Sequence, residues 1–127
     1  MRRLRFFVLS ALLVLTACAG WARVETLLQQ TPRKVQSLRN PFEGQPAATR
    51  AGTKLFAREC AGCHGSDALG IGKAPPLIQF EVREAAPGAL FWILRNGSLR
   101  YGMPSFAHLP EAQRWQIITY LKALKSQ

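Results

Sequence analysis

The chain has 127 residues, with 17 Lys or Arg against 7 Asp or Glu, and a formal net charge of +10. This length leaves room for one small domain and excludes a chain of several domains. The positive charge suits an anionic membrane surface, an acidic protein partner or nucleic acid, but an export signal at the N-terminus argues against nucleic acid. The basic residues form no run of five or six, so an ordinarily solvated surface is the alternative explanation.

The first residues have the composition of that export signal. Three arginines among the first five residues form a basic region, residues 6–15 are apolar, and small residues follow. The run Leu15-Thr16-Ala17-Cys18 resembles a bacterial lipobox, in which the cysteine is acylated and becomes the first residue of the mature protein. We therefore expect a signal peptide over residues 1–17 and a lipid on Cys18, which would anchor the protein in the bacterial cell envelope, facing the periplasm.

Two other outcomes of the signal stay open. Ala17-Cys18-Ala19 also fits the A-x-A pattern of ordinary signal peptidase, which would give a soluble periplasmic protein. An uncleaved anchor is the other outcome, although residues 6–19 fall short of the roughly 20 apolar residues that a spanning helix needs. Lipidation has the further support that it accounts for an odd thiol in an exported protein.

Residues 18–48 read as a flexible membrane tether. They contain three prolines, several glutamines and few periodic apolar positions, a composition typical of an extended, semi-stiff segment. A short helix over residues 24–30 is compatible with the sequence. The globular domain is expected over residues 49–127, a size at which an apolar core alone supplies little net stability.

The domain begins with a predicted helix over residues 49–59, with Leu55 and Phe56 on its apolar side. Gly52 lies inside this helix, where a glycine costs about 1 kcal/mol relative to alanine. Such a glycine usually marks the close approach of another backbone. We therefore expect another part of the backbone to approach this helix closely at Gly52.

The run Cys60-Ala61-Gly62-Cys63-His64 follows, and C-x-x-C-H is the attachment motif for a c-type haem. Its two thiols can each add to a vinyl group of one porphyrin, and the histidine then lies under the iron as its proximal ligand. The motif predicts one covalent haem c, held by Cys60 and Cys63 and ligated by His64.

Two other uses of a C-x-x-C pair have less support. A structural zinc site needs four thiolate or imidazole ligands, and beyond the motif the chain offers only Cys18 and His108. A thioredoxin-like redox pair needs a βαβ pattern, whereas the flanking segments read as helices and Gly/Pro loops. The redox dithiol remains the alternative to the haem.

Two more helices are predicted after the motif. One begins at Pro87, a favourable first helical residue, and ends at Asn96-Gly97. The other begins at Pro110 and continues to about Lys125, with apolar residues recurring at helical spacing. No alternation typical of strands lies between them, so the predicted fold is all-α.

Haem iron bound by one histidine has a sixth coordination position, whose occupant decides between electron transfer and chemistry on a small ligand. Met103 is the only methionine besides Met1 and lies in Tyr101-Gly102-Met103-Pro104-Ser105-Phe106, where glycine and proline favour a tight, rigid loop. We predict that Met103 is the sixth ligand. His108 is its rival, because imidazole also binds low-spin iron, and gap-filling in the core is the non-ligand alternative.

Together these features resemble the small class I cytochromes c over about residues 49–123. The features concerned are Gly52 and Phe56, the C-x-x-C-H motif, Pro75-Pro76-Leu77, Gly102-Met103-Pro104, and a last helix with Trp115 and Tyr120. The resemblance implies a fold of three main helices wrapped around one covalently attached haem. It also implies that Gly52 and Phe56 pack crosswise on Tyr120.

The resemblance assigns roles to further residues around the haem. The carbonyl of Pro75 would accept a hydrogen bond from His64 Nδ1 and so orient the ligand. Leu77 would line the haem. Trp92 would lie near the porphyrin, with plain core packing as the alternative.

The function expected from a His/Met-ligated haem is that of an electron carrier, not an enzyme, which shuttles single electrons between membrane or periplasmic redox partners. We expect it to act as a monomer and to bind no nucleic acid. Basic residues flank the haem-bearing segments and would steer the protein to an acidic docking surface on its partner: Lys54, Arg58, Lys73, Arg95 and Arg100.

Two other functions stay open. The chain could be the electron-accepting subunit of a quinoprotein dehydrogenase or oxidase complex, with no independent carrier role. It could also be a haem peroxidase or a gas sensor, which would need an open or displaceable sixth position on the iron.

Overall fold

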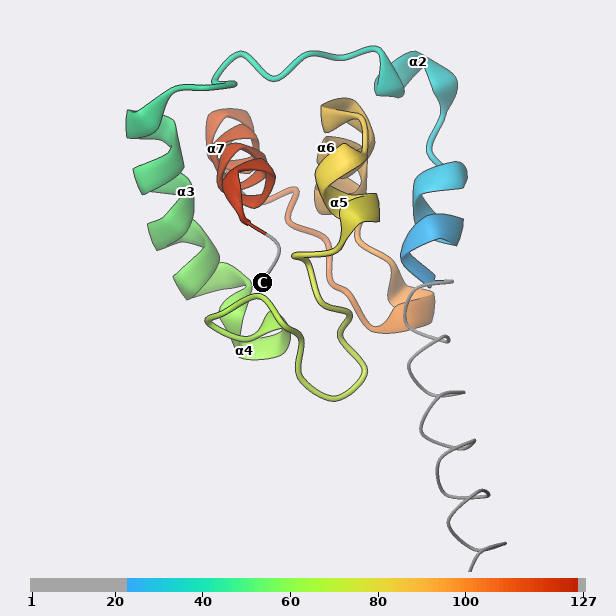
Figure 1. The fold of residues 1–127 in the computed structure, drawn as a ribbon. Helices are drawn as coiled ribbons and strands as arrows, with labels where there is room; N and C mark the ends of the chain where they lie inside the picture. The colour runs from blue at the N-terminus through green and yellow to red at the C-terminus, as the bar shows by residue number, and fades with distance from the viewer. Residues whose placement is uncertain (1–22, 126–127) are drawn as a thin grey trace, which may run out of the picture.

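Helices and loops make up residues 23–125, the part of the chain that the computed structural model describes (Figure 1). No strand occurs among these residues. An isolated antiparallel bridge joins Ser98 to Met103. The all-α prediction is therefore confirmed. The expected signal peptide and Cys18 lie outside the described residues, and no helix within 23–125 has the length and apolar character needed to cross a membrane.

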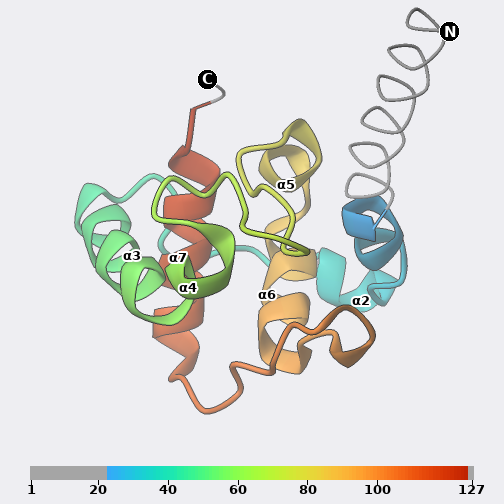
Figure 2. The ribbon, with the colours of Figure 1, turned by 90° about the horizontal axis from the view of Figure 1, so that it is seen from below.

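The three longest helices are those predicted from the sequence, and α7 lies between α3 and α6 (Figures 1 and 2). Proline occupies the first turn of α3 and of α6, where its missing N–H leaves no hydrogen bond unmade. After a helical stretch at 23–29, the elements are α2 (Arg33–Gln36), α3 (Pro46–Glu59), α4 (Ala61–His64), α5 (Phe80–Glu84), α6 (Pro87–Asn96), a 3-10 turn (Leu99–Tyr101) and α7 (Glu111–Ala123).

The crossing of α3 and α7 depends on Gly52. A Cβ atom built at this position would lie 2.0 Å from the carbonyl oxygen of Gln116 and 2.8 Å from Cβ of Tyr120, so no side chain fits. One turn further along α3, the ring of Phe56 lies 5.1 Å from that of Tyr120. The contact predicted for this glycine is confirmed, and it joins the first and last parts of the predicted domain.

On its other side, α7 packs against α6. The rings of Phe91 and Trp115 stack with their centroids 4.1 Å apart and their planes 17° from parallel. Ile117 and Ile118 are fully buried. Because α7 is covered from both sides, it holds α3 and α6 at a fixed separation.

Residues 23–48, which we expected to form a flexible tether, are instead packed onto the domain from Arg23 on. Val24 is buried in the same apolar cluster as the core of the domain. Pro32 does not extend the chain but immediately precedes α2. The buried side chain of Asn40 donates hydrogen bonds to Oγ1 of Thr119 (2.9 Å) and to the carbonyl oxygen of Trp115 (3.2 Å). These tertiary contacts to α7 outweigh the segment's extended composition.

Candidate functional site

A cavity of about 440 Å³ lies among α3, α4, α6, α7 and the loops that follow α4 and α6. Its volume falls in the range of about 300–1,000 Å³ that is typical of cofactor sites. Much of its wall is apolar and includes Phe56, Val82, Leu90, Leu94, Ile117 and Leu121. The structure brings the cofactor-site residues predicted from the sequence together on this wall: Cys60, Cys63, His64, Pro75, Leu77 and Met103.

The two cysteines both line the cavity but differ in exposure. Cys60 is buried at the end of α3, whereas Cys63, one turn later, is exposed. Burial raises the pKa of the Cys60 thiol to about 11, with smaller contributions from the charges of Glu59 and Cys63. A redox-active dithiol needs a nucleophilic thiolate and hence a lowered pKa. The surroundings of Cys60 therefore do not suit the redox dithiol.

His64 is oriented by the hydrogen bond expected from the sequence. Its Nδ1 lies 3.0 Å from the carbonyl oxygen of Pro75. Because a carbonyl oxygen only accepts, Nδ1 carries the proton and Nε2 keeps its lone pair. Burial lowers the pKa of His64, and the hydrogen bond to Pro75 opposes this in part. The ring is thus held as a neutral imidazole, the form that ligates a metal.

The loop after α4 places the Pro75 carbonyl by folding back on the cysteine-containing turn. The backbone N–H of Gly70 donates to the carbonyl oxygen of His64 (2.7 Å), and that of Ile71 donates to Cys63 (3.0 Å). Gly70 has φ +85°, and a Cβ there would lie 2.4 Å from the carbonyl oxygen of Ala74. This glycine was not among the predicted site residues, although its place six residues after His64 is visible in the sequence.

Met103 lies half-buried on a loop whose backbone is fixed at both ends. Ser98 and Met103 exchange two backbone hydrogen bonds of 2.8 and 3.0 Å. Beyond them, the N–H of Phe106 donates to the carbonyl oxygen of Leu94 in α6 (2.9 Å). Gly97, with φ +68°, allows the return of the loop, because a Cβ there would lie 2.6 Å from the backbone of Pro104. The thioether is therefore carried by a rigid loop, as its glycine and proline predict.

A buried arginine that sequence reasoning missed supports the same loop. Nη1 of Arg114 donates to the carbonyl oxygens of Leu109, Ala107 (3.3 Å) and Phe106 (3.4 Å). Its guanidinium lies 5.0 Å from the centre of the Phe91 ring. The sequence carried a signal, because Arg114 lies three, four and seven positions before the buried residues of α7, on their face of the helix.

Two residues considered in the sequence lie away from the cavity. His108, the rival sixth ligand, is exposed and does not line the cavity. Trp92 is half-buried and is also absent from the wall, to which its neighbour Ile93 contributes instead. The position implied for Trp92 by the family resemblance, near a porphyrin in this cavity, is therefore not observed.

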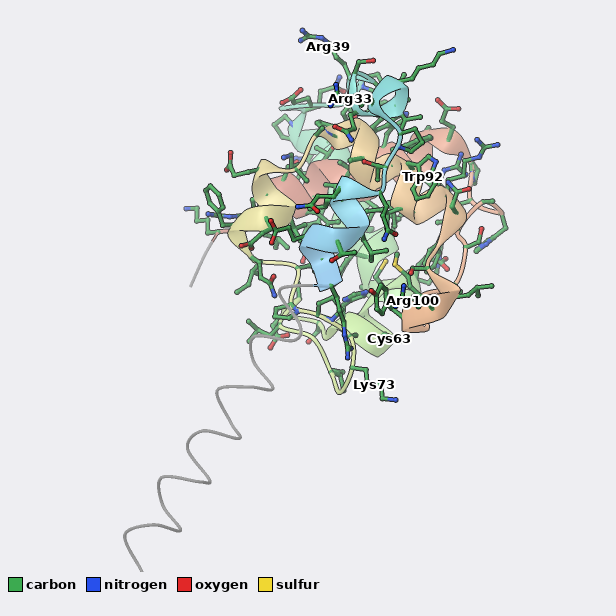
Figure 3. All side chains as sticks on the ribbon, turned by 90° about the vertical axis from the view of Figure 1, so that its right-hand side faces the viewer. Arg33, Arg39, Cys63, Lys73, Trp92 and Arg100 are labelled. Atoms are coloured by element: carbon green, nitrogen blue, oxygen red, sulfur yellow. The ribbon has the colours of Figure 1, made fainter. Side chains whose placement is uncertain are left out.

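Basic side chains lie close to the residues of the motif, and Lys73 itself lines the cavity. Figure 3 shows Lys73 and Arg100 near Cys63, at the end opposite to Arg33 and Arg39. The basic residues expected around the site are all exposed: Lys54, Arg58, Lys73, Arg95 and Arg100.

Comparison with protein families matches residues 47–121 to "Cytochrome C oxidase, cbb3-type, subunit III". The matched segment holds nearly all of α3, the C-x-x-C-H motif, α6, the Met103 loop and most of α7. Neither the curated proteins nor the solved structures gave a match to the chain. A cytochrome c domain implies covalent haem c and an electron carrier that is typically non-catalytic. Since the match spans more than half of the chain, the protein belongs to the cytochrome c family, in the group described as subunit III of cbb3-type cytochrome c oxidase.

Proposed function

We propose that the protein carries single electrons on one haem c, which Cys60 and Cys63 hold as thioethers and His64 and Met103 ligate. The observation that carries the proposal is the convergence of these four side chains on one cavity with an apolar wall. The neutral His64, with its proton on Nδ1, offers the lone pair that ligation needs. When bound, the haem supplies a reversible one-electron change between ferric and ferrous iron.

The residues around the cavity suit electron transfer better than catalysis. The apolar wall keeps water from the cofactor. Its side chains carry no dipoles that would have to reorient when the iron gains or loses an electron. The thioether of Met103 favours ferrous iron and so raises the reduction potential. A peroxidase or gas sensor needs a displaceable sixth ligand, whereas the Met103 loop is fixed by the paired hydrogen bonds of Ser98 and by those of Arg114.

The attachment of the haem is tested by the mass and spectrum of the protein produced with a cytochrome c maturation system. We expect the mass to rise by one haem that survives denaturation, and a low-spin spectrum in both oxidation states. Cys63→Ala should leave at most one thioether and much less holoprotein. Cys18→Ser is the matched control, because it removes the third cysteine and should carry a full haem. A wild-type chain without covalent haem would refute the proposal.

We propose further that Cys18 is lipidated and anchors the protein to the periplasmic face of a bacterial membrane. The lipobox-like run and the odd cysteine support this location. In cell fractionation, Cys18→Ser should move the haem protein from the membrane fraction to the soluble periplasmic fraction. Retention of the variant in the membrane would point to an uncleaved anchor, and a soluble wild type to ordinary signal cleavage.

A second candidate function is that of a subunit in a larger complex. The matched family is described as a subunit of cbb3-type oxidase, which favours an oxidase over a quinoprotein dehydrogenase as that complex. Detergent-solubilised membranes from the same fractionation distinguish the two candidates. A free carrier elutes alone at the size of a monomer, whereas a subunit elutes with the other chains of the oxidase.

A further inference from the structure

The helical stretch at residues 23–29 forms part of the cavity wall although it lies outside the family match, which begins at residue 47. Val24, Leu27 and Leu28 line the cavity together with the cysteines of the motif. Their spacing of three and four positions places them on one face of the helix. Figure 3 shows this helix on the side of the domain that faces the viewer.

Side-chain hydrogen bonds fix the end of this helix to the turn that follows it. Oγ1 of Thr31, a buried residue, donates to the carbonyl oxygen of Leu28 (2.6 Å). Nε2 of Gln36 donates to the carbonyl oxygen of Thr31 (2.8 Å) and contacts its Oγ1 (3.0 Å). These hydrogen bonds join the helix to α2, which contains Gln36, across the turn at residues 30–32.

α2 is in turn attached to the domain. A Cβ built on Gly88 of α6 would lie 1.8 Å from the carbonyl oxygen of Val35, so the two backbones are in direct contact. A few residues later, Asn40 is hydrogen-bonded to α7 through Thr119. Because these two contacts lie close to the 23–29 helix along the chain, they keep the helix next to the cavity.

Arg23 adds a positive charge to the wall. Its guanidinium carbon lies 5.8 Å from the centre of the Tyr101 ring, and both residues line the cavity. The charged residues of the wall are Arg23, Glu59 and Lys73. Within residues 23–125 the one ion pair joins Arg58 to Glu59, so Arg23 has no carboxylate partner in that part of the chain. A haem brings two propionate carboxylates, which would meet a wall with an excess of positive charge.

We propose that the 23–29 helix is the outer wall of the haem pocket, in which Val24, Leu27 and Leu28 exclude water and Arg23 pairs with a propionate. This inference rests on the proposed haem site. Ferric haem carries one more positive charge than ferrous haem, so both the dry wall and the added positive charge favour the ferrous form. The segment therefore sets the reduction potential in addition to connecting the domain to the residues before it.

The apolar part of the wall is tested by Leu28→Asn in the holoprotein, with Leu38→Asn as the matched control. Leu38 belongs to the same segment but is exposed and does not line the cavity. We expect Leu28→Asn to lower the reduction potential and to speed amide hydrogen exchange in residues 23–30 roughly tenfold or more, because a polar side chain is poorly accommodated in a dry wall. Leu38→Asn should leave both quantities as in the wild type.

The charged part is tested by Arg23→Gln against Arg39→Gln, which removes the same charge from the far end of the molecule (Figure 3). Arg23→Gln should lower the potential clearly more than Arg39→Gln, with the low-spin spectrum and the haem content unchanged. If Leu28→Asn fails to fold, this pair of variants still tests the inference, because Arg23 is not in the core and its replacement should leave the protein folded.

The inference is overturned if Arg23→Gln and Arg39→Gln have the same potential and if the amides of residues 23–30 exchange at the rate of unstructured chain in the wild-type holoprotein. That outcome leaves the proposed function intact, because the protein would still carry its covalent haem. Failure of the proposed function is seen separately, as a wild-type protein without added haem mass.

Discussion

Replacing Met103 with alanine is expected to leave the haem attached but to lower the reduction potential by an amount on the order of tenths of a volt. The thioether stabilises ferrous iron, and its loss leaves a water or no ligand in its place. Attachment should survive because the thioether bonds are made by Cys60, at the end of α3, and by Cys63, in α4, and do not involve Met103. The measurement is a potentiometric titration of the holoprotein, followed by its absorption spectrum.

Binding of carbon monoxide to the reduced protein is a second measurement of the effect of Met103→Ala. The wild type should bind it poorly, and Met103→Ala should bind it readily. Leu99→Ala is the matched control, because Leu99 lies in the same connection, is 87% exposed and does not line the cavity. An unchanged spectrum in Met103→Ala would contradict the assignment, and His108→Ala would then be the next variant.

The rate of electron transfer to an acidic partner is expected to fall at least about tenfold as salt rises from 0.01 to 0.15 M, because the Debye length shrinks from about 30 to about 8 Å. The reason is the positive charge close to the cysteine motif, where Lys73 lines the cavity and both Lys73 and Arg100 lie near Cys63 (Figure 3). The measurement is stopped-flow oxidation of the reduced holoprotein by an acidic redox protein over a series of salt concentrations.

Charge variants at the two ends of the molecule localise the effect. Lys73→Gln and Arg100→Gln should slow the reaction at low salt and approach the wild-type rate at high salt. Arg33→Gln and Arg39→Gln remove the same charge from the far end and should have little effect (Figure 3). A rate that does not depend on salt, or equal effects at both ends, would rule out steering by this surface.

The sequence predicted the three long helices because their boundaries are marked by local chemistry. Pro87 and Asn96-Gly97 bound α6 as predicted. α3 begins at Pro46, three residues before the predicted start, because that proline was assigned to the tether. The one-turn α5 was not predicted, since five residues give little periodic signal.

The short helix that the sequence allows over residues 24–30 is present at 23–29, but the packing of this segment onto the domain could not be predicted in the same way. Val24, Leu27 and Leu28 form a short apolar stripe that is too brief to specify a stable helix on its own. Its position depends on contacts with residues far along the chain, such as Asn40 with Thr119 in α7. Long-range contacts of this kind leave no pattern in the local sequence.

The residues of the candidate site also fall into two groups, those that the local sequence indicates and those that only the packing reveals. The C-x-x-C-H motif is local, and Met103 follows from the small number of methionines, so both were accessible from the sequence. The Pro75 acceptor came from the family resemblance, and the structure contains its hydrogen bond to His64. Arg114 and Arg23 were missed, because a charged residue on a helix is ordinarily solvated. For Arg114 the spacing to the buried residues of α7 was a signal, whereas only the packing places Arg23 against the cavity.

The docked N-terminal segment changes how far the domain could travel from a bilayer. Five peptide units separate Cys18 from Arg23, and even fully extended they span at most about 18 Å. With a lipid on Cys18, the haem protein would be confined to a layer close to the membrane surface, where it would diffuse in two dimensions. Its redox partners would then be proteins of the same membrane, met by lateral collision, and a carrier that crosses the periplasm would need a different tether.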